Sequence, residues 1–358
     1  MRALLILTVK NEASFLLEWL AHHRAVGFDH VLAFSNDCSD GTDAMLDRLA
    51  ELGGVTHVRH DGPHPEGPQW AALKAADRHP LVRDADWILF ADVDEFVNIH
   101  PGDHTLSALL AALPDADAIA LTWRMFGNAG VVEFQDAPVT ETFTRAAPVT
   151  LSWPWRAQMF KTLFANNGAW RKLGVHRPRS PVEGRSPRWF DGSGRDVSTR
   201  LSGKAMFSDY RRDNYQLVQL NHYALGAMQS YIVKCDRGRA NVEASGFDMG
   251  YWIERNFCDD EDRSIAQLNS AELRRGLLAD PVLGRLHADG VAWRKSRFAA
   301  LMGQEPWRAM FGRLLMCGAS RVLGPKEQAM ILAHAPEAAP NRVLNRASKP
   351  DWSGTEID

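Results

Sequence analysis

Several features that would assign this 358-residue chain to a familiar class are scarce or missing. The four cysteines form no CxxC pair, so we expect no structural zinc site or redox motif, and a reducing compartment is the natural setting. No stretch approaches about 18 uncharged apolar residues, which predicts no membrane-spanning helix. The formal net charge of -3 does not suggest the basic surface of a nucleic-acid-binding protein. These absences favour a cytoplasmic globular protein without a nucleic-acid partner.

The residues that are present suffice for a large core. Hydrophobic residues make up 45% of the chain and charged residues 24%, a balance typical of folded proteins. The short apolar run from Met1 to Val9 is followed at once by Lys10, Asn11 and Glu12, without a small-residue cleavage site. This pattern predicts a first β-strand and not a signal peptide.

Strand-like and helix-like patterns alternate over about the first 95 residues. This alternation predicts an α/β fold with a mostly parallel sheet flanked by helices, and such sheets bind ligands at the carboxyl ends of their strands. The polar clusters at 10–12, 35–40 and 92–95 each follow a strand, so we expect them on one edge of the sheet. Strands are predicted at 3–9, 30–34, 55–58 and 87–91, and helices at 14–26, 42–52 and 69–78.

The run Asp92-Val93-Asp94 follows the fourth predicted strand and has the composition of a metal site. Two carboxylates one residue apart at a strand end can share one ion directly or through water. Hard oxygen ligands suit Mn²⁺ or Mg²⁺, which also bind phosphate oxygens and stabilise the charge of a leaving diphosphate. An isolated pair of this kind more often caps the next segment or faces solvent. Its place at the end of a strand in an α/β sheet favours the metal interpretation.

Five stretches occur in the order that is typical of GT-A fold glycosyltransferases, and they resemble the motifs of family 2 and of bacterial family 92-like enzymes. The resemblance covers about residues 1 to 265. It implies a GT-A fold and an enzyme that moves a sugar from a nucleoside-diphosphate sugar to a glycan or glycolipid acceptor, with a metal ion and with inversion. The stretches are Thr8 to Glu12, Ser35 to Thr42, Phe90 to Phe96, Trp123 to Asn128, and Asn221 to Tyr223 followed by Ser230 and Lys234.

The resemblance also assigns roles by position. It places Asp94 on the metal as a catalytic residue, and Asp92 on the ribose or the metal. Asp40 has an alternative role, because an aspartate before Gly-Thr is a good helix cap. The residues that we expect to contact the donor nucleotide are Thr8, Glu12, Asn36, Asp40, Asp92 and Lys234.

Histidines and basic residues complete the expected site. His222 is predicted as the third metal ligand beside the two aspartates, although a histidine at such a position is often an ordinary core residue. His176 competes with it as a ligand or a substrate contact. Three basic residues are candidates for stabilising the negative charge of a bound diphosphate: Lys161, Lys234 and Arg237. The alternative for each is an ordinary solvated position on the surface.

An inverting transfer also needs a general base that takes the proton of the acceptor hydroxyl. A carboxylate after the metal strand suits this role, and no spacing selects one residue. The predicted catalytic carboxylates are Asp191 and Glu133. The full set of candidates is Glu133, Asp136, Glu141, Asp191 and Asp262.

The chain beyond the resemblance is expected to be helical. We predict a catalytic domain over 1–262 (a nucleotide-binding half at 1–95 and an acceptor half at 96–262), a helical region over 263–340 and a flexible tail over 341–358. The helical region mixes arginines with apolar residues, which is typical of a solvated helical face. The alternative is contact with anionic lipid at the inner face of the membrane.

Two other functions fit parts of the pattern. A glycan-binding module of the same fold without turnover would keep the sheet and lose the chemistry. A nucleotidyltransferase would use a similar sheet and metal, but it predicts a glycine-rich phosphate loop after the first strand. Lys10, Asn11 and Glu12 occupy that position, so this function ranks last.

Overall fold

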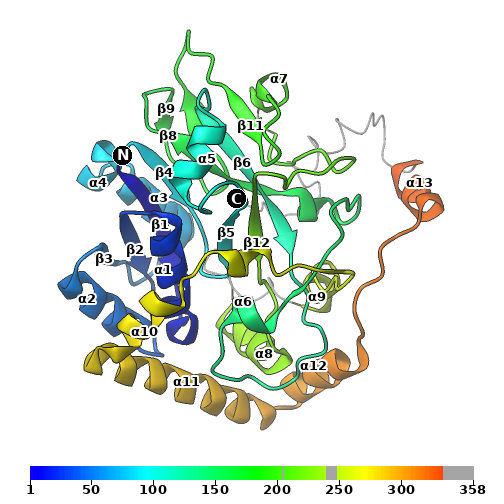
Figure 1. The fold of residues 1–358 in the computed structure, drawn as a ribbon. Coiled ribbons are helices and arrows are strands. Elements are labelled where there is room, and N and C mark those ends of the chain that lie inside the picture. The colour runs from blue at the N-terminus through cyan, green and yellow to red at the C-terminus, as the bar shows by residue number, and fades with distance from the viewer. Residues whose placement is uncertain (204, 239–247, 334–358) are drawn as a thin grey trace.

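A computed structural model describes residues 1–203, 205–238 and 248–333 (Figure 1). The predicted tail over 341–358 lies outside the described residues. The N-terminal third alternates strands and helices as the sequence predicts. Its elements are β1 (Ala3–Val9), α1 (Ala13–Val26), β2 (His30–Ser35), α2 (Thr42–Leu52), β3 (Val55–Arg59), α3 (Pro68–Ala76), α4 (Pro80–Asp84) and β4 (Trp87–Phe90).

The middle of the chain adds strands to the same sheet and connects them by long loops. The strand β5 directly follows the acidic turn and was not predicted, whereas α5 and β6 fall where short apolar runs occur in the sequence. The main elements are β5 (Glu95–Ile99), α5 (Leu106–Ala112), β6 (Ala118–Met125), β8 (Phe160–Ala165), β9 (Trp170–Lys172), β10 (Arg179–Pro181), β11 (Trp189–Asp191), α7 (Ser198–Leu201) and β12 (Val218–His222).

The main sheet has the strand order β3-β2-β1-β4-β8-β6-β12-β5, with β11 added beside β6. The strands β1 to β4 pair in parallel, and so do β6 with β12 and with β11. β8 runs antiparallel to β4 and β6, and β5 runs antiparallel to β12. Parallel pairings predominate, so the predicted α/β fold class is confirmed.

The apolar run of β1 explains why the sheet is buried on both faces. Leu5 and Leu7 pack into one hydrophobic cluster with the helices α1 and α2, while Leu4 and Ile6 pack into a second cluster with α3. Successive side chains of a strand point to opposite faces, so an uninterrupted apolar strand needs cover on both sides. The helices on the two faces provide this cover.

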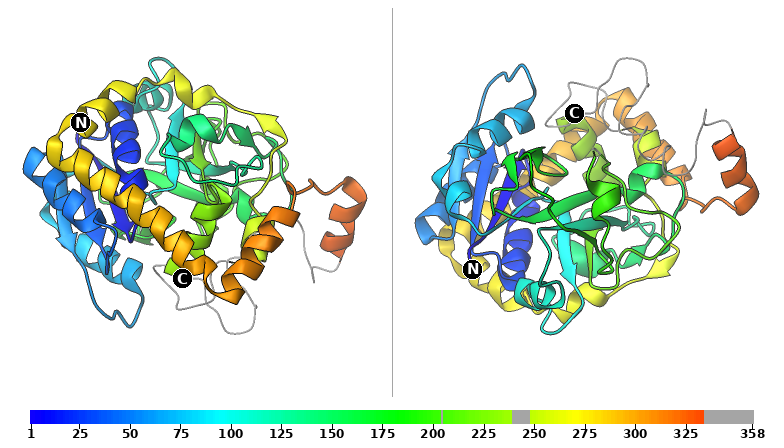
Figure 2. Two further views of the ribbon diagram at one scale, coloured as in Figure 1. Left: turned by 90° about the horizontal axis from the view of Figure 1, so that it is seen from below. Right: turned by 90° about the horizontal axis from the view of Figure 1, so that it is seen from above.

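The C-terminal helices pack against the sheet domain. α10 (Ala271–Ala279) and α11 (Pro281–Met302) contact α1, and α11 also contacts α2 and α8 (Met228–Arg237). α12 (Glu305–Met316) contacts α8 and α9 (Met249–Ile253), and α13 (Pro325–Ala333) ends the described chain. Figure 2 shows α11 crossing the N-terminal helices. Within the described residues, helices make up most of 271–333, inside the region 263–340 that the sequence predicts to be helical.

The basic residues of these helices do not form one exposed face. Arg294 is buried against the first loop of the sheet domain. Arg297 pairs with Asp236, and Arg308 pairs with Glu305. Within the described residues, every helix is too short or too polar to cross a bilayer. Contact with a membrane surface stays a prediction.

Candidate functional site

A cavity of about 1830 Å³ lies at the carboxyl edge of the parallel strands. The end of β1 lines it with Thr8 and Val9, the segment after β1 with Lys10 and Glu12, and the turn after β4 with Asp92 to Asp94. The end of β12 contributes His222, and α8 contributes Lys234 and Arg237. Two of the three predicted polar clusters line this cavity, and the third, at 35–40, lies on the same edge of the sheet, where the Ser39 amide donates to Asn11 Oδ1 at 2.7 Å.

The turn between β4 and β5 that carries the acidic pair is held from several sides. The Asp92 amide donates to Glu95 Oε2 at 2.9 Å, and the Glu95 amide donates to the Asp92 carbonyl at 3.1 Å. The indole Nε1 of Trp19 donates to both the Asp92 and the Glu95 carbonyls at 3.0 Å. This bonding fixes the direction in which the two aspartates point before any ligand arrives.

Asp92 has a buried lysine as its counter-ion. Lys161 on β8 is fully buried, and its Nζ lies 3.0 Å from Asp92 Oδ2 and 3.6 Å from Glu95 Oε2. Burial alone would lower the pKa of Lys161, but the charges of Asp92 and Glu95 outweigh it and raise the pKa. Burial raises the pKa of Glu95, against the opposing charge of Lys161. Glu95 Oε1 also accepts a hydrogen bond from Trp123 Nε1 at 2.6 Å.

Asp94 faces a lysine and a histidine. Lys234 Nζ lies 2.7 Å from Asp94 Oδ2, and His222 Nε2 lies 3.8 Å from the same oxygen. Burial would raise the pKa of Asp94, but the charge of Lys234 and the adjacent imidazole of His222 outweigh it and hold the pKa well below its ordinary value. Burial lowers the pKa of His222. Asp94 is thus an ionised carboxylate beside a neutral imidazole.

Strand pairing brings His222 to the acidic turn. β12 runs antiparallel to β5 with His222 opposite Glu95, and the Tyr223 amide donates to the Asp94 carbonyl at 2.9 Å. The His222 ring packs on Trp123, with ring centroids 4.5 Å apart. The histidine predicted from a distant motif is therefore a neighbour of Asp94.

The residues present fit a divalent ion at Asp94 and His222. His222 Nε2 faces Asp94 Oδ2 at 3.8 Å, and Asp94 offers an oxygen of the type that Mn²⁺ and Mg²⁺ bind. In the described part of the chain, no group of three or more histidine, cysteine or acidic side chains is placed to hold an ion. Asp92 Oδ2 lies 3.0 Å from Lys161 Nζ, and the predicted three-residue shell of Asp92, Asp94 and His222 stays a prediction.

His176 also lines the cavity, as a second neutral imidazole. Its Nδ1 lies 3.1 Å from the Phe160 carbonyl, which accepts the ring proton and leaves Nε2 with a lone pair. Burial, with the nearby charge of Lys161, lowers the pKa of His176 to about 3. The ring packs edge-on against Trp123, with a centroid distance of 5.6 Å. A nitrogen held in this way is suited to accept a hydrogen bond from a substrate hydroxyl.

Glu12 has a structural role that the sequence analysis missed. It pairs with Arg237 of α8 and, at 3.2 Å, with Arg294 of α11. Arg237 also donates to the Lys10 carbonyl at 2.7 Å, and Arg294 donates to the Asn11 carbonyl at 3.1 Å. Two arginines, one from α8 inside the family resemblance and one from α11 beyond it, therefore fix the loop after β1.

Breaking the contact from α11 is expected to destabilise the fold. Arg294→Leu leaves one oxygen of buried Glu12 without its ion-pair partner, so the free energy of unfolding should fall by about 3 kcal/mol. The matched control is Arg297→Leu on the same helix. Because the ion pair of Arg297 is half-exposed, its loss should change the free energy of unfolding by less than about 1 kcal/mol. Urea unfolding monitored by tryptophan fluorescence measures both. Equal effects for the two variants would refute the anchoring role of Arg294.

Asn36 and Asp40 lie outside the cavity lining. Asp40 accepts hydrogen bonds from the Ala13 amide at 2.9 Å and from the Thr42 amide and hydroxyl at 2.9 and 2.6 Å. Asn36 donates to the His60 carbonyl at 3.0 Å. The structure thus favours the capping alternative for Asp40, and it gives Asn36 a loop-holding contact. The predicted nucleotide contacts of these two residues stay untested.

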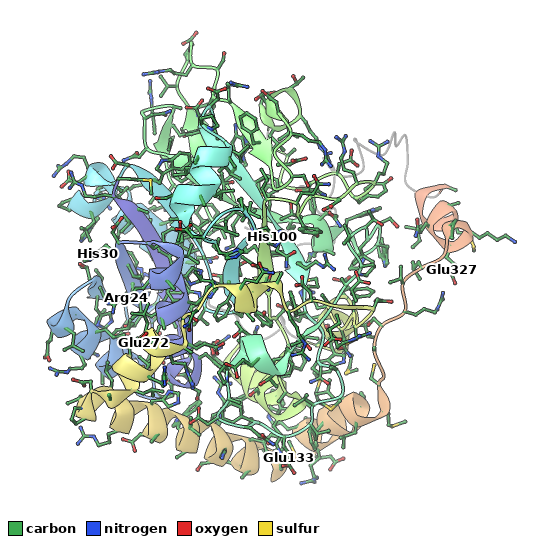
Figure 3. The ribbon with its side chains drawn as sticks, viewed as in Figure 1. Arg24, His30, His100, Glu133, Glu272 and Glu327 are labelled. Carbon is green, nitrogen blue, oxygen red and sulfur yellow. The ribbon has the colours of Figure 1, made fainter. Side chains whose placement is uncertain are left out.

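The carboxylates predicted as the general base also lie outside the cavity lining. Glu133 is exposed at the edge of the molecule near the C-terminal helices (Figure 3). Asp191 accepts from the Ser193 and Arg195 amides at 3.0 and 2.9 Å and pairs with the Arg195 side chain, so it closes its own loop. Asp136 instead pairs with His287 of α11.

A hydrogen-bonded chain of Ser35, His57 and Asp47 resembles a nucleophile with its base. The Ser35 hydroxyl lies 2.8 Å from His57 Nε2, and His57 Nδ1 lies 2.6 Å from Asp47 Oδ1. Ser35 is only 1% exposed, and none of the three residues lines the cavity. The chain therefore connects β2, β3 and α2 and has no access to a substrate.

The fold and the site define an α/β protein with an acidic, cation-flanked cavity at the carboxyl edge of its sheet. A family model described as glycosyltransferase family 92 matches residues 7–188, just over half of the sequence. The chain belongs to glycosyltransferase family 92. This match confirms the resemblance that its motifs indicate.

Two plant proteins of the same family are similar over part of their length. A family 92 protein of Oryza sativa subsp. japonica is 25% identical over 142 residues, which cover 38% of this chain and 23% of the rice protein. One of Ricinus communis is 28% identical over 148 residues, which cover 37% of this chain and 24% of that protein. The match thus spans about a quarter of the length of either relative.

Similarities to solved structures are weaker. S. aureus TarS in complex with UDP is 18% identical, with coverage of 46% and 47% of the two chains and a TM-score of 0.28. Glucosyl-3-phosphoglycerate synthase from Mycobacterium tuberculosis, in complex with Mn²⁺ and UDP, is 18% identical, with coverage of 34% and 44% and a TM-score of 0.23. The assignment therefore depends on the family match and on the topology of the sheet.

Proposed function

We propose that the chain is a metal-dependent glycosyltransferase that moves a sugar from a nucleoside-diphosphate sugar to a glycan or glycolipid acceptor. The observation that carries the proposal is the ionised Asp94, held beside His222 in a cavity at the carboxyl edge of the sheet. Membership of a glycosyltransferase family supports the same reaction. Inversion at the transferred sugar is the part of the proposal that depends on the resemblance alone.

Each residue of the donor half has a distinct part in this proposal. Asp94 and His222 would hold a Mn²⁺ or Mg²⁺ ion, which supplies charge stabilisation for the leaving diphosphate when bound. Lys234 and Arg237 lie on one helix and bring positive charge to the same side of the cavity. Charge-assisted hydrogen bonds from such groups strengthen phosphate binding. Asp92, paired with Lys161, would orient the ribose.

Thr8 and Glu12 would form the floor of the nucleotide pocket. Thr8 lines the cavity at the end of β1 and Glu12 lines it in the loop that follows, which the arginine pairs of Glu12 keep in place. The general base should be sought among carboxylates that reach the cavity. Glu183 and Asp196 line it on the acceptor side, whereas Glu133 and Asp191 do not.

A titration of the purified chain with nucleoside diphosphates, with and without Mn²⁺, tests the proposal. We expect one nucleotide to bind and Mn²⁺ to strengthen its binding at least about tenfold, because an ion held by Asp94 and His222 would offset the charge of the diphosphate. Calorimetry gives both dissociation constants, and EDTA should reverse the gain. Equal affinity with and without the ion would refute metal dependence. Absence of binding by every nucleotide would refute the donor site, and binding without turnover would favour the glycan-binding alternative.

A further inference from the structure

The cavity extends well beyond the residues assigned to the donor. Its volume of about 1830 Å³ exceeds the roughly 300 to 1,000 Å³ that are usual for a single small ligand. The additional lining comes from the continuous segment 174–188, which contains β10 and leads into β11. We call this segment the arginine arm, because it contains Arg177, Arg179, Arg185 and Arg188. A second ligand would contact this arm.

The cations of the donor half are largely neutralised by carboxylates of the protein. Lys161 pairs with Asp92, Lys234 with Asp94, and Arg237 with Glu12. These pairs reduce the net positive charge that the donor half presents. A diphosphate there is expected to depend on a metal ion for part of its neutralisation.

The arginine arm differs in its charge balance. Arg188 pairs with Asp115 and Asp196, but Arg177, Arg179 and Arg185 form no ion pair with any carboxylate in the described part of the chain. Three guanidinium groups on one side of a cavity repel one another and gain from a bound anion. Glu183 is the one carboxylate of the segment 174–188, against four arginines, so the arm carries net positive charge along the cavity.

Arg177 and Arg179 are held in place by backbone and aromatic contacts. Arg177 donates to the Ala205 and Leu201 carbonyls at 2.9 and 2.7 Å, and its Cζ lies 4.7 Å from the Trp189 ring centroid. Arg179 donates to the Leu173 carbonyl at 2.8 Å, and its Cζ lies 4.5 Å from the Trp70 ring centroid. Guanidinium groups stacked in this way keep donors in their plane for a carboxylate or a phosphate.

We propose that the arginine arm binds a carbohydrate acceptor that carries a carboxylate or a phosphate group. The inference rests on the proposed glycosyltransferase function and adds the charge class of its acceptor. The arm places the anionic group at Arg179 and Arg185, while the cavity leads from there to the acidic turn. A neutral sugar of the same chain length would leave these guanidinium groups without a counter-charge.

Binding to matched pairs of oligosaccharides tests the proposal. One pair is an oligogalacturonate and its carboxyl-reduced form, and the other is a phosphorylated mannan oligosaccharide and its phosphatase-treated form. Surface plasmon resonance on the full-length chain gives the affinities. We expect at least one anionic member to bind at least about tenfold more tightly than its neutral counterpart. The pair that shows the difference identifies the carboxylate or the phosphate as the recognised group.

Single substitutions locate the binding site on the arm. Arg179→Gln should weaken the binding of the anionic glycan about tenfold. Arg185 is more exposed, so Arg185→Gln should weaken this binding by a smaller factor. Neither substitution should alter the binding of the neutral counterpart. The matched control is Arg171→Gln on β9, because Arg171 alternates with the cavity-lining Trp170 and lies outside the lining. The control should bind both glycans like the unchanged chain. An unchanged melting temperature verifies that each variant folds.

The possible outcomes separate this proposal from the function on which it rests. Equal binding of neutral and anionic glycans, or binding of neither, overturns the acceptor proposal. The proposal is also overturned if Arg171→Gln lowers the affinity for the anionic glycan as much as Arg179→Gln does. The effect would then reflect the net charge of the chain and not a binding site on the arm. Nucleotide titration of the same samples provides the distinction. If nucleotide binds but anionic glycans are not preferred, only the proposal that the arginine arm binds an anionic acceptor is refuted. If the unchanged chain binds no nucleotide, the proposed donor site is refuted.

Discussion

Asp94→Asn is expected to lower the rate of sugar transfer by about a thousandfold or more while the chain stays folded. The amide matches the carboxylate in size but lacks the charge that binds a divalent ion. It also leaves Lys234, which now lies 2.7 Å from Asp94 Oδ2, without its counter-ion. Initial rates of donor hydrolysis or transfer, measured over a range of Mn²⁺ concentrations, test this expectation. The apparent affinity for the ion should fall together with the rate.

The control for this experiment is Asp84→Asn at the end of α4. Asp84 is half-exposed and contacts Arg83 at 3.4 Å, away from the cavity lining. Its rate and Mn²⁺ dependence should equal those of the unchanged chain. A transfer rate for Asp94→Asn within tenfold of the unchanged chain would show that Asp94 does not hold the ion. Loss of the folded state in circular dichroism would instead assign a structural role to Asp94.

Lys161→Met is expected to lower the free energy of unfolding by about 3 to 5 kcal/mol. Lys161 is fully buried between Asp92 and Glu95, and Glu95 is itself fully buried. Methionine fills a similar volume but leaves the Glu95 carboxylate without a cation. Urea unfolding measures the loss, and Lys74→Met on α3 is the control. The ammonium of Lys74 pairs with Glu66 on the surface, so its loss should cost less than about 1 kcal/mol.

A second substitution identifies the cause of this loss. Lys161→Met deprives both Asp92 and Glu95 of their cation; adding Glu95→Gln removes the more deeply buried of these two carboxylates and retains an acceptor for the Trp123 indole. The double variant should therefore be more stable than Lys161→Met alone, which a double-mutant cycle expresses as a coupling energy. A double variant whose loss of stability equals the sum of the losses in the two single variants would contradict the buried-pair explanation. In that case loss of packing would account for the result.

The N-terminal alternation of strands and helices was predictable because it depends on local patterns. β1 is one apolar run, and α1 has helical spacing and ends at Gly27, which has the left-handed backbone that a glycine stop requires. β5 was missed because Glu95 looks like part of a polar loop. Glu95 is in fact fully buried, and besides the nearby Asp92 amide it depends on two side-chain partners, Lys161 and Trp123. Both partners are distant in the sequence.

The site was predictable where polar residues directly follow strands, and less so elsewhere. Asp94 lines the cavity as expected, and motif order pointed to His222 before its position was known. Glu133 and Asp191 were selected only by residue type, and both lie outside the lining. The arginine arm was visible in the sequence as a segment rich in arginine, but its composition alone does not separate a solvated loop from a cavity wall.

The sequence by itself determined the α/β fold class, the acidic turn after the fourth strand and the family to which the chain belongs. These features are local runs of residues, and their order along the chain is sufficient to recognise them. The tertiary structure decided which charges meet. Antiparallel pairing of β12 with β5 placed His222 beside Asp94, and the packing of α11 on α1 brought Arg294 to Glu12. Electrostatic partners depend on distance in space, and distances between remote segments are set only when the chain packs.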